Sequence, residues 1–321
     1  MMGFVVRIGM LFAALLACAA QAQNYPTKPI RLVVTYPPGG GADVMARLIA
    51  PKLGELLGQP VVVENRPGAT GQIAAEFVAK SAPDGYTLML DASSYVVNPS
   101  LFAKLPYDPL KAFAPITQLV QFPNMVVVSP GFPVNSVAEL IAMAKAKPGS
   151  ISFASSGNGS AQHLAAELFR LQTGVDMVHI PYRGGALAMT DVMAGQIPLF
   201  FANMASGLPH VKSGRLKALA STGGHRSPNM PDLATVAESG VPGYEAYEWN
   251  AVFAPAATPQ AIINRLYGEI VKVLASGEVR ERIVQLGGEI VASSPQDTDK
   301  YLRAQMIKWA KVVKDAGVKV D

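Results

Sequence analysis

Short runs of β-branched and apolar residues alternate along the chain with longer stretches whose apolar positions recur every three or four residues. The short runs predict β-strands, and the longer stretches predict amphipathic helices. The predicted strands are Ile30–Tyr36, Pro60–Glu64, Tyr86–Asp91, Met125–Ser129, Ile151–Ala154, Met177–Pro181, Leu199–Ala202, Leu216–Ser221 and Trp249–Ala254. The predicted helices are Asp43–Leu57, Gly71–Ser81, Ser136–Lys145, Ser160–Leu171, Gly185–Ala194, Pro259–Ala275 and Asp297–Lys314. Pro51 indicates a bend or a broken turn in the first of these helices, and the last is expected to pack along an outer edge.

The alternation of strands and helices predicts an α/β fold with mixed, mainly parallel sheets. Two stretches rich in proline or glycine, 115–123 and 222–242, interrupt the alternation, and we interpret them as crossings between two domains. We therefore expect domain 1 to contain residues 23–122 and 225–321, and domain 2 to contain residues 123–224. Two crossings form a hinge that permits closure around a ligand.

The first 22 residues have the layout of a secretory signal peptide. Arg7 precedes the apolar run Ile8–Ala20, and Ala20-Gln21-Ala22 is a small-x-small cleavage site. The apolar run is shorter than the ~18 residues typical of a membrane-spanning helix. The sequence Leu15-Leu16-Ala17-Cys18 also resembles a bacterial lipoprotein cleavage box, so lipid attachment at Cys18 is the alternative to a soluble exported chain.

Composition limits the classes of function that the chain can have. Its 321 residues are 50% hydrophobic and 16% charged, enough for a substantial core in two domains. Cleavage after Ala22 would remove Arg7 and no acidic residue, which changes the formal charge from +4 to +3. Lysine and arginine are not clustered, so a nucleic-acid partner is not expected. Cys18 is the single cysteine, so the mature chain would have no disulfide and no thiol nucleophile.

The segment from Tyr36 to Asp43 lies between a predicted strand and a predicted helix and contains three consecutive glycines. Glycine permits a close approach of the backbone to a ligand, and a helix N-terminus offers unpaired N–H groups and the positive end of a dipole. This pattern favours an anion, whereas the alternative is a simple strand-to-helix turn. The candidate binding residues in this segment are Tyr36, Pro38, Gly39, Gly40, Gly41 and Asp43.

The same design recurs in the second predicted domain, where a loop follows a strand and opens a helix. The hydroxyl of Ser160 can cap that helix. Two such loops, at strand ends in separate domains, are the arrangement expected for a ligand bound between α/β units. The candidates in this second loop are Ser155, Ser156, Gly157, Gly159 and Ser160.

Three further loops follow predicted strands and add candidates to both domains. Tyr36 and Tyr182 can line a pocket with an apolar face and one hydroxyl each. Arg183 either adds a fixed positive charge or is a solvated residue at the rim. The additional candidates are Gly68, Ala69, Ser93, Ser94, Tyr182, Arg183 and Gly184.

Patterns typical of catalysis, metal binding or cofactor binding are weak in this sequence. Ser160 and His163 could meet on a helix, but neither a nucleophile elbow nor an orienting acid accompanies them. The four histidines are dispersed without metal-ligand spacing. Phosphate-binding and dinucleotide-binding motifs are also missing. We therefore expect no catalytic residue, no metal and no cofactor.

A series of motifs along the chain resembles the solute-binding proteins of tripartite tricarboxylate transporters, also called the Bug family. The motifs are Tyr25-Pro26-x-Lys28-Pro29-Ile30, Pro37-Pro38-Gly39-Gly40-Gly41-x-Asp43, 63–69, 83–88, Ser156-Gly157-x-Gly159-Ser160-x-x-His163-Leu164, 181–184, 212–220, 231–240 and 308–317. The resemblance implies a periplasmic binding protein of the type II fold. It also implies that main-chain groups of the two glycine loops hold a ligand carboxylate, partly through ordered waters.

The resemblance further implies a membrane permease as partner and a small carboxylate ligand, namely a di- or tricarboxylate, an aromatic acid or an acidic amino acid. We also expect a monomer, and a periplasmic sensor is the alternative role. The chain departs from the family pattern at Ala42, Ala257, Gln196-Ile197-Pro198-Leu199 and Ala202. An aspartate is frequent at the position of Ala202. Its loss removes a possible partner for a ligand ammonium, which favours a plain carboxylate over an amino acid.

Overall fold

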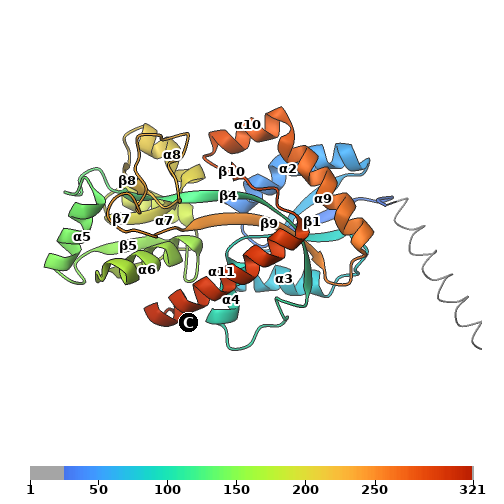
Figure 1. Ribbon diagram of the computed structural model, residues 1–321, viewed down its shortest axis with the longest axis horizontal. Helices are drawn as coiled ribbons and strands as arrows, with labels where there is room; N and C mark the ends of the chain where they lie inside the picture. The colour runs from blue at the N-terminus through green and yellow to red at the C-terminus, as the bar shows by residue number, and fades with distance from the viewer. Residues whose placement is uncertain (1–24, 320–321) are drawn as a thin grey trace, which may run out of the picture.

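The computed structural model describes residues 25–319, so the predicted signal peptide and Cys18 lie outside the described residues. Two groups of strands form the two halves of an elongated molecule, and the long strand β4 (Phe113–Val128) runs through both (Figure 1). The first half contains β1 (Ile30–Val34), β2 (Val61–Asn65), β3 (Thr87–Asp91), β9 (Tyr247–Pro255) and β10 (Glu289–Ile290). The second half contains β5 (Ser152–Ser155), β6 (Val178–Pro181), β7 (Leu199–Asn203) and β8 (Lys217–Ser221).

Helices cover both halves of the sheet (Figure 1). They are α2 (Gly41–Leu57), the short 3-10 helix η1 (Ala69–Gly71), α3 (Gln72–Ala79), α4 (Ser94–Leu101), α5 (Val137–Ala146), α6 (Ala161–Thr173), α7 (Gly185–Met193), α8 (Met204–Lys212), α9 (Gln260–Ala275), α10 (Gly277–Gln285) and α11 (Pro295–Ala316). In the described chain, no helix is long and apolar enough to span a membrane.

The sheet is parallel in its outer parts and antiparallel where the halves join. β1 pairs in parallel with β2 and β3, and β5 pairs in parallel with β6 and β7. β9 is antiparallel to β3 and β4, and β4 is antiparallel to β7 and β8. The α/β fold with mixed sheets is confirmed. Because parallel strands end at the same edge of a sheet, the loops after β1, β2 and β3 are close together, as are those after β5 and β6.

The passage between the halves occurs within β4. Pro123 pairs with Tyr247 on β9, whereas Asn124 pairs with Asn203 on β7. The returning chain stays with the second half well beyond residue 224, because the Tyr244 hydroxyl donates to the carbonyl oxygen of Ala165, 2.8 Å away. We therefore propose that domain 2 extends to about residue 246, beyond the predicted boundary at residue 224.

Several elements differ from the expectation for physical reasons. The stretch 115–123, interpreted as a crossing between domains and not predicted as a strand, belongs to β4, and Ile116, Leu119 and Val120 on it are fully buried. Register irregularities near Pro115 accommodate the proline in the strand. Pro51 lies inside α2 without ending the helix. Helices α4, α8 and α10 were not predicted.

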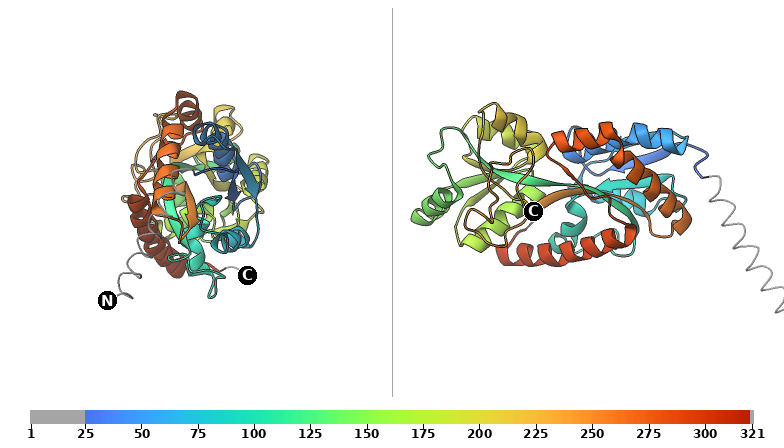
Figure 2. Two further views of the ribbon diagram at one scale, coloured as in Figure 1. Left: turned by 90° about the vertical axis from the view of Figure 1, so that its right-hand side faces the viewer. Right: turned by 45° about the horizontal axis from the view of Figure 1, so that its top comes forward.

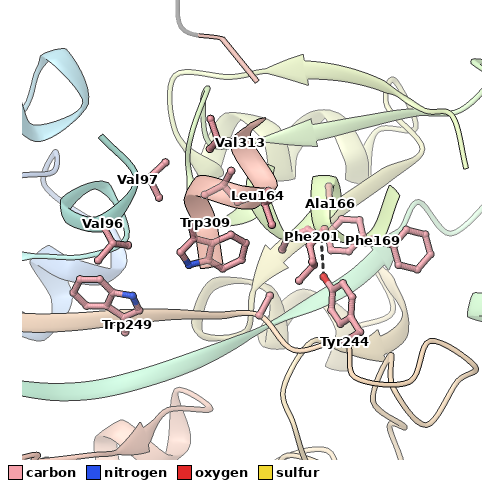
Figure 3. Packing of buried hydrophobic residues seen from close by; sticks show 14 of the residues in the cluster. Val96, Val97, Leu164, Ala166, Phe169, Phe201, Tyr244, Trp249, Trp309 and Val313 are labelled. Atoms are coloured by element: carbon pink, nitrogen blue, oxygen red, sulfur yellow. Dashed lines mark hydrogen bonds between the residues drawn. The ribbon is translucent and has the colours of Figure 1, made fainter. Parts of the chain in front are cut away.

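The C-terminal helix α11 packs against α4 of the first half and α6 of the second. Figure 2 shows α11 running along one side of the molecule across both halves. Trp309 on α11 is 3% exposed and lies in a buried apolar cluster with Val97 of α4 and Leu164 of α6 (Figure 3). The helix therefore links the two halves through the core and not merely along an outer edge.

Candidate ligand-binding site

Helix α2 begins at Gly41, within the predicted glycine segment Tyr36–Asp43 and two residues earlier than the predicted start at Asp43. Its N-cap, Gly40, provides no side-chain acceptor for the first turn. Within residues 25–319, the amides of Gly41, Ala42 and Asp43 donate no hydrogen bond to protein, because the first bond of this helix runs from Val44 N to Gly40 O. An uncapped N-terminus of this kind combines free N–H donors with a positive dipole end and favours an anion.

Asp43 holds the glycine loop in place. Its carboxylate accepts hydrogen bonds from Gly39 N at 2.9 Å, Arg47 Nε at 3.0 Å and Asn65 Nδ2 at 2.8 Å. Burial alone would raise the pKa of this carboxyl, but the hydrogen bonds from Arg47, Gly39 and Asn65 outweigh burial and lower it. Both carboxylate oxygens accept hydrogen bonds from the protein itself, so we assign Asp43 a positioning role.

The loops after β1, β2 and β3 meet around Ser94. The Tyr36 hydroxyl donates to Ser94 Oγ at 3.1 Å, and Ser94 Oγ donates to Asp91 Oδ1 at 2.7 Å. A Cβ atom at Gly71 would lie 3.1 Å from the same Ser94 oxygen. Burial raises the pKa of the Tyr36 phenol well above its usual range. Of the predicted residues of domain 1, Tyr36 and Ser94 are therefore in direct contact, and the neighbouring Ser93 is buried.

The loop after β2 has a strained backbone. Ala69 and Thr70 have φ angles of 45° and 54°, a left-handed region that side chains disfavour, and Gly68 precedes them at 127°. Each such non-glycine residue costs about 1–3 kcal/mol and persists only where its surroundings hold it. Asn98 of α4 holds it, because its Nδ2 donates to Thr70 O at 2.9 Å.

Asp91 lies beneath this group and is 1% exposed. Burial raises the pKa of its carboxyl to about 6, although hydrogen bonds from Thr35 and Ser94 oppose the rise. Since the folded-state pKa exceeds the unfolded value, the protein loses stability as the pH rises from about 4 to above 6. Asparagine can accept the same hydrogen bonds without a charge. The difference in unfolding free energy between Asp91→Asn and the wild type should therefore shift in favour of the variant by at least about 2 kcal/mol when the pH is raised from about 4 to about 8.

Urea unfolding of both proteins at the two pH values measures this gain. A difference between variant and wild type that stays constant with pH would show that Asp91 does not titrate as proposed.

Two histidines hold the loop between β5 and α6 at its two ends. His179 Nε2 lies 2.6 Å from Ser155 Oγ, and His163 Nδ1 accepts from Gly159 N at 3.1 Å. The imidazole rings stack with their centroids 3.7 Å apart. Burial, followed by the proximity of His163, lowers the pKa of His179 to about 3. The supporting histidines were not predicted as site residues, although the spacing of His163 four residues after Gly159 was a usable signal.

The remaining residues of this loop are ordered by the helix and by the neighbouring loop. Ser160 caps α6 by accepting from His163 N at 3.2 Å, and Gly157 N donates to Ser155 Oγ at 3.1 Å. A Cβ atom at Gly185 would lie 3.0 Å from Ser156 Oγ. The loops after β5 and β6 therefore form a second group.

Tyr182 and Arg183 differ in how firmly they are placed. Tyr182 N donates to Ser155 O at 3.1 Å, and its hydroxyl donates to Asp191 Oδ2 at 2.7 Å. Burial and the hydrogen bond to Asp191 raise the pKa of Tyr182 to about 12. Arg183 is exposed and makes no side-chain hydrogen bond within the described chain, and Gly184 follows it as the N-cap of α7.

The two groups approach each other at Glu248 on β9. Glu248 Oε2 accepts from Gln162 Nε2 of α6 at 2.7 Å and from Asn203 Nδ2 of β7 at 2.9 Å. A Cβ atom at Gly41 would lie 3.3 Å from Glu248 Oε1. A Cβ atom at Gly159 would overlap the side chain of Leu101 on α4. Glu248, Gln162 and Asn203 were missed by the sequence analysis, because nothing in their local pattern distinguishes them from ordinary polar residues.

Two surface hollows lie away from these loops. One, of about 730 Å³, is lined by residues of α2 and β2. The other, of about 400 Å³, is lined by residues 227–229, by parts of α9 and α10 and by the segment 287–292 that contains β10. Neither contains a residue of the two glycine loops, so we base the site on the converging loops.

Comparison with known proteins identifies the family. The family model described as "Tripartite tricarboxylate transporter family receptor" matches residues 45–318. The chain belongs to this receptor family. The receptor is 40% identical over 316 residues to Protein BugT of Bordetella pertussis, covering 98% of this chain and 97% of BugT. The predicted Bug-family membership is thereby confirmed.

Solved structures of similar proteins agree with the fold. Rpa4515 of R. palustris, solved with adipate, is 37% identical to the receptor with a TM-score of 0.86, and the match covers 92% of this chain and 99% of that one. MatC from Rhodopseudomonas palustris, solved with bound malate, is 29% identical with a TM-score of 0.82, and the match covers 90% and 100% of the two chains.

Proposed function

We propose that this receptor captures a small carboxylate in the periplasm and delivers it, chemically unchanged, to the membrane permease of a tripartite transporter. The carboxylate lies between the N-termini of α2 and α6, where the two loop groups converge. The observation that carries this proposal is the uncapped first turn of α2, where Gly41 lies against Glu248, the residue that also accepts from Gln162 in the first turn of α6. Adipate and malate, present in the structures of two similar proteins, both carry carboxylates.

The two loop groups suit capture without chemistry. The loop residues are fixed by Asp43, His163 and His179 inside each half, so the ligand meets a preformed surface on either side. Among the described residues, no acid hydrogen-bonds the His179 ring beside Ser155, so this serine and histidine lack the third member of a hydrolytic triad. The expectation that no acid accompanies His163 was wrong, because Glu167 Oε1 lies 3.5 Å from its Nε2. Ser160 Oγ, however, accepts from the backbone N of His163 and forms no hydrogen bond with its ring. Bound acid is therefore expected to be recovered intact.

Thermal unfolding with a panel of acids tests the proposal. A ligand that binds only the folded state stabilises it by ~2.7 kcal/mol at a concentration a hundredfold above its dissociation constant. We expect at least one di- or tricarboxylate, aromatic acid or acidic amino acid to raise the unfolding temperature by several degrees. A panel that leaves the unfolding temperature unchanged throughout would contradict carboxylate capture.

A further inference from the structure

Glu248 occupies a central position between the two loop groups. It is half-buried near the start of β9, opposite Phe122 on β4. Gln162 in the first turn of α6 donates to it from one side, and Gly41 at the start of α2 lies against its other oxygen. A carboxylate of the protein itself is therefore placed between the two helix N-termini where the ligand is proposed to bind.

The two oxygens of Glu248 have different surroundings. Oε2 accepts two amide hydrogen bonds, from Gln162 and Asn203. Oε1 accepts no hydrogen bond from the described residues, and no lysine or arginine there forms an ion pair with Glu248. Burial raises the pKa of Glu248 against the opposing effect of these amides. A half-buried carboxylate without a cationic partner loses part of its hydration, and a cation that reaches Oε1 would offset that loss.

The charge at this position restricts which acids fit. A ligand that brings only carboxylates would place like charges side by side, which disfavours binding. A ligand with an ammonium beside its carboxylate brings opposite charges to two different partners. The carboxylate can meet the free amides of α2, and the ammonium can donate to Oε1.

In the sequence, the absence of an aspartate at position 202 favours a plain carboxylate over an amino acid, but the position of Ala202 in the fold removes this argument. Ala202 is fully buried in the apolar cluster of the second half, and the neighbouring Asn203 faces the site. Position 202 therefore does not supply the carboxylate that would meet an ammonium. Glu248, from a different strand, supplies one.

We propose that Glu248 is a specificity-determining residue whose Oε1 accepts a hydrogen bond from a ligand ammonium, so that the receptor selects amino acids over the corresponding acids without an amino group. This inference rests on the proposed function, since it concerns the same site.

Calorimetric titration with matched ligand pairs tests it. The pairs are L-aspartate and succinate, L-glutamate and glutarate, L-leucine and 4-methylpentanoate, and L-phenylalanine and 3-phenylpropionate. In at least one pair, the wild-type receptor should bind the amino acid at least tenfold more tightly. Glu248→Gln, which can still accept from Gln162 and Asn203, should weaken that amino acid roughly 10- to 100-fold. Glu281→Gln, on the exposed surface of α10, is the control for loss of one negative charge.

The outcomes separate this inference from the proposed function. Binding of deaminated acids alone, or an amino-acid affinity that Glu248→Gln changes less than twofold, overturns the role of Glu248 and leaves carboxylate capture standing. If none of the amino acids and none of the acids without an amino group binds the wild-type receptor, the result counts against the role of Glu248 and against carboxylate capture. The wild-type preference within each pair is measured independently of how well the variant folds.

Discussion

Replacing Trp309 with alanine is expected to lower the free energy of unfolding by about 3–5 kcal/mol, the range for a buried tryptophan. The side chain is 3% exposed and lies among apolar residues from both halves, including Val97 and Leu164 (Figure 3). Its Nε1 also donates to Gln305 Oε1 at 2.9 Å. Because α11 packs on α4 and α6, the substitution removes packing between the halves and not only within one of them.

Chemical unfolding of Trp309→Ala beside Ile307→Ala measures this effect. Ile307 lies on the same helix but is 75% exposed, so its replacement should change stability by less than about 0.5 kcal/mol. Equal, small losses for the two variants would mean that α11 is not anchored in the core as described.

Replacing Asp43 with alanine is expected to cost about 3 kcal/mol of stability and to weaken ligand binding at least tenfold, because it releases three donors that hold the glycine loop. The lowered pKa of Asp43 implies that its stabilisation is present above about pH 4 and is lost as the pH falls through the folded-state value. The loss of stability in Asp43→Ala should therefore shrink in acid.

Asp299→Ala is a matched control for this substitution. Arg303 and Asp299 form an Arg–Asp pair at the same helical spacing as Arg47 and Asp43, but the Asp299 side chain is 45% exposed and that of Asp43 only 4%. Exposed pairs of this kind contribute about 0.3–0.5 kcal/mol. Comparable losses in the two variants would argue that burial of Asp43 does not matter and that the loop keeps its shape without it.

Much of the architecture follows from local patterns in the sequence. The β-branched run at β1 and the amphipathic pattern of α2 predict those elements closely, because the same residues that favour each conformation are buried by it. The glycine loop was predictable for a similar reason, since the strand, the glycines and the helix that follows them lie in one continuous segment.

Features that depend on distant parts of the chain were not predictable in this way. The prolines of 115–123 interrupt the strand pattern and led us to expect a crossing without a strand, yet pairing with β9 makes the segment part of β4. Glu248 carries no local signal, and its position follows from the register of β9 against β4 and from contacts with α6 and β7. The supporting role of His179 likewise arises from the pairing of β5 with β6, which places it beside Ser155.

The central claim is that the free amides of α2 and the loop before α6 hold a carboxylate. Calorimetric titration of an acid selected by thermal unfolding, compared with its neutral primary amide, tests this claim most directly. The acid should bind with a measurable enthalpy, and the amide should bind at least a hundredfold more weakly, because hydrogen bonds to a charged group are the stronger ones. Equal binding of acid and amide would contradict a carboxylate site at these loops.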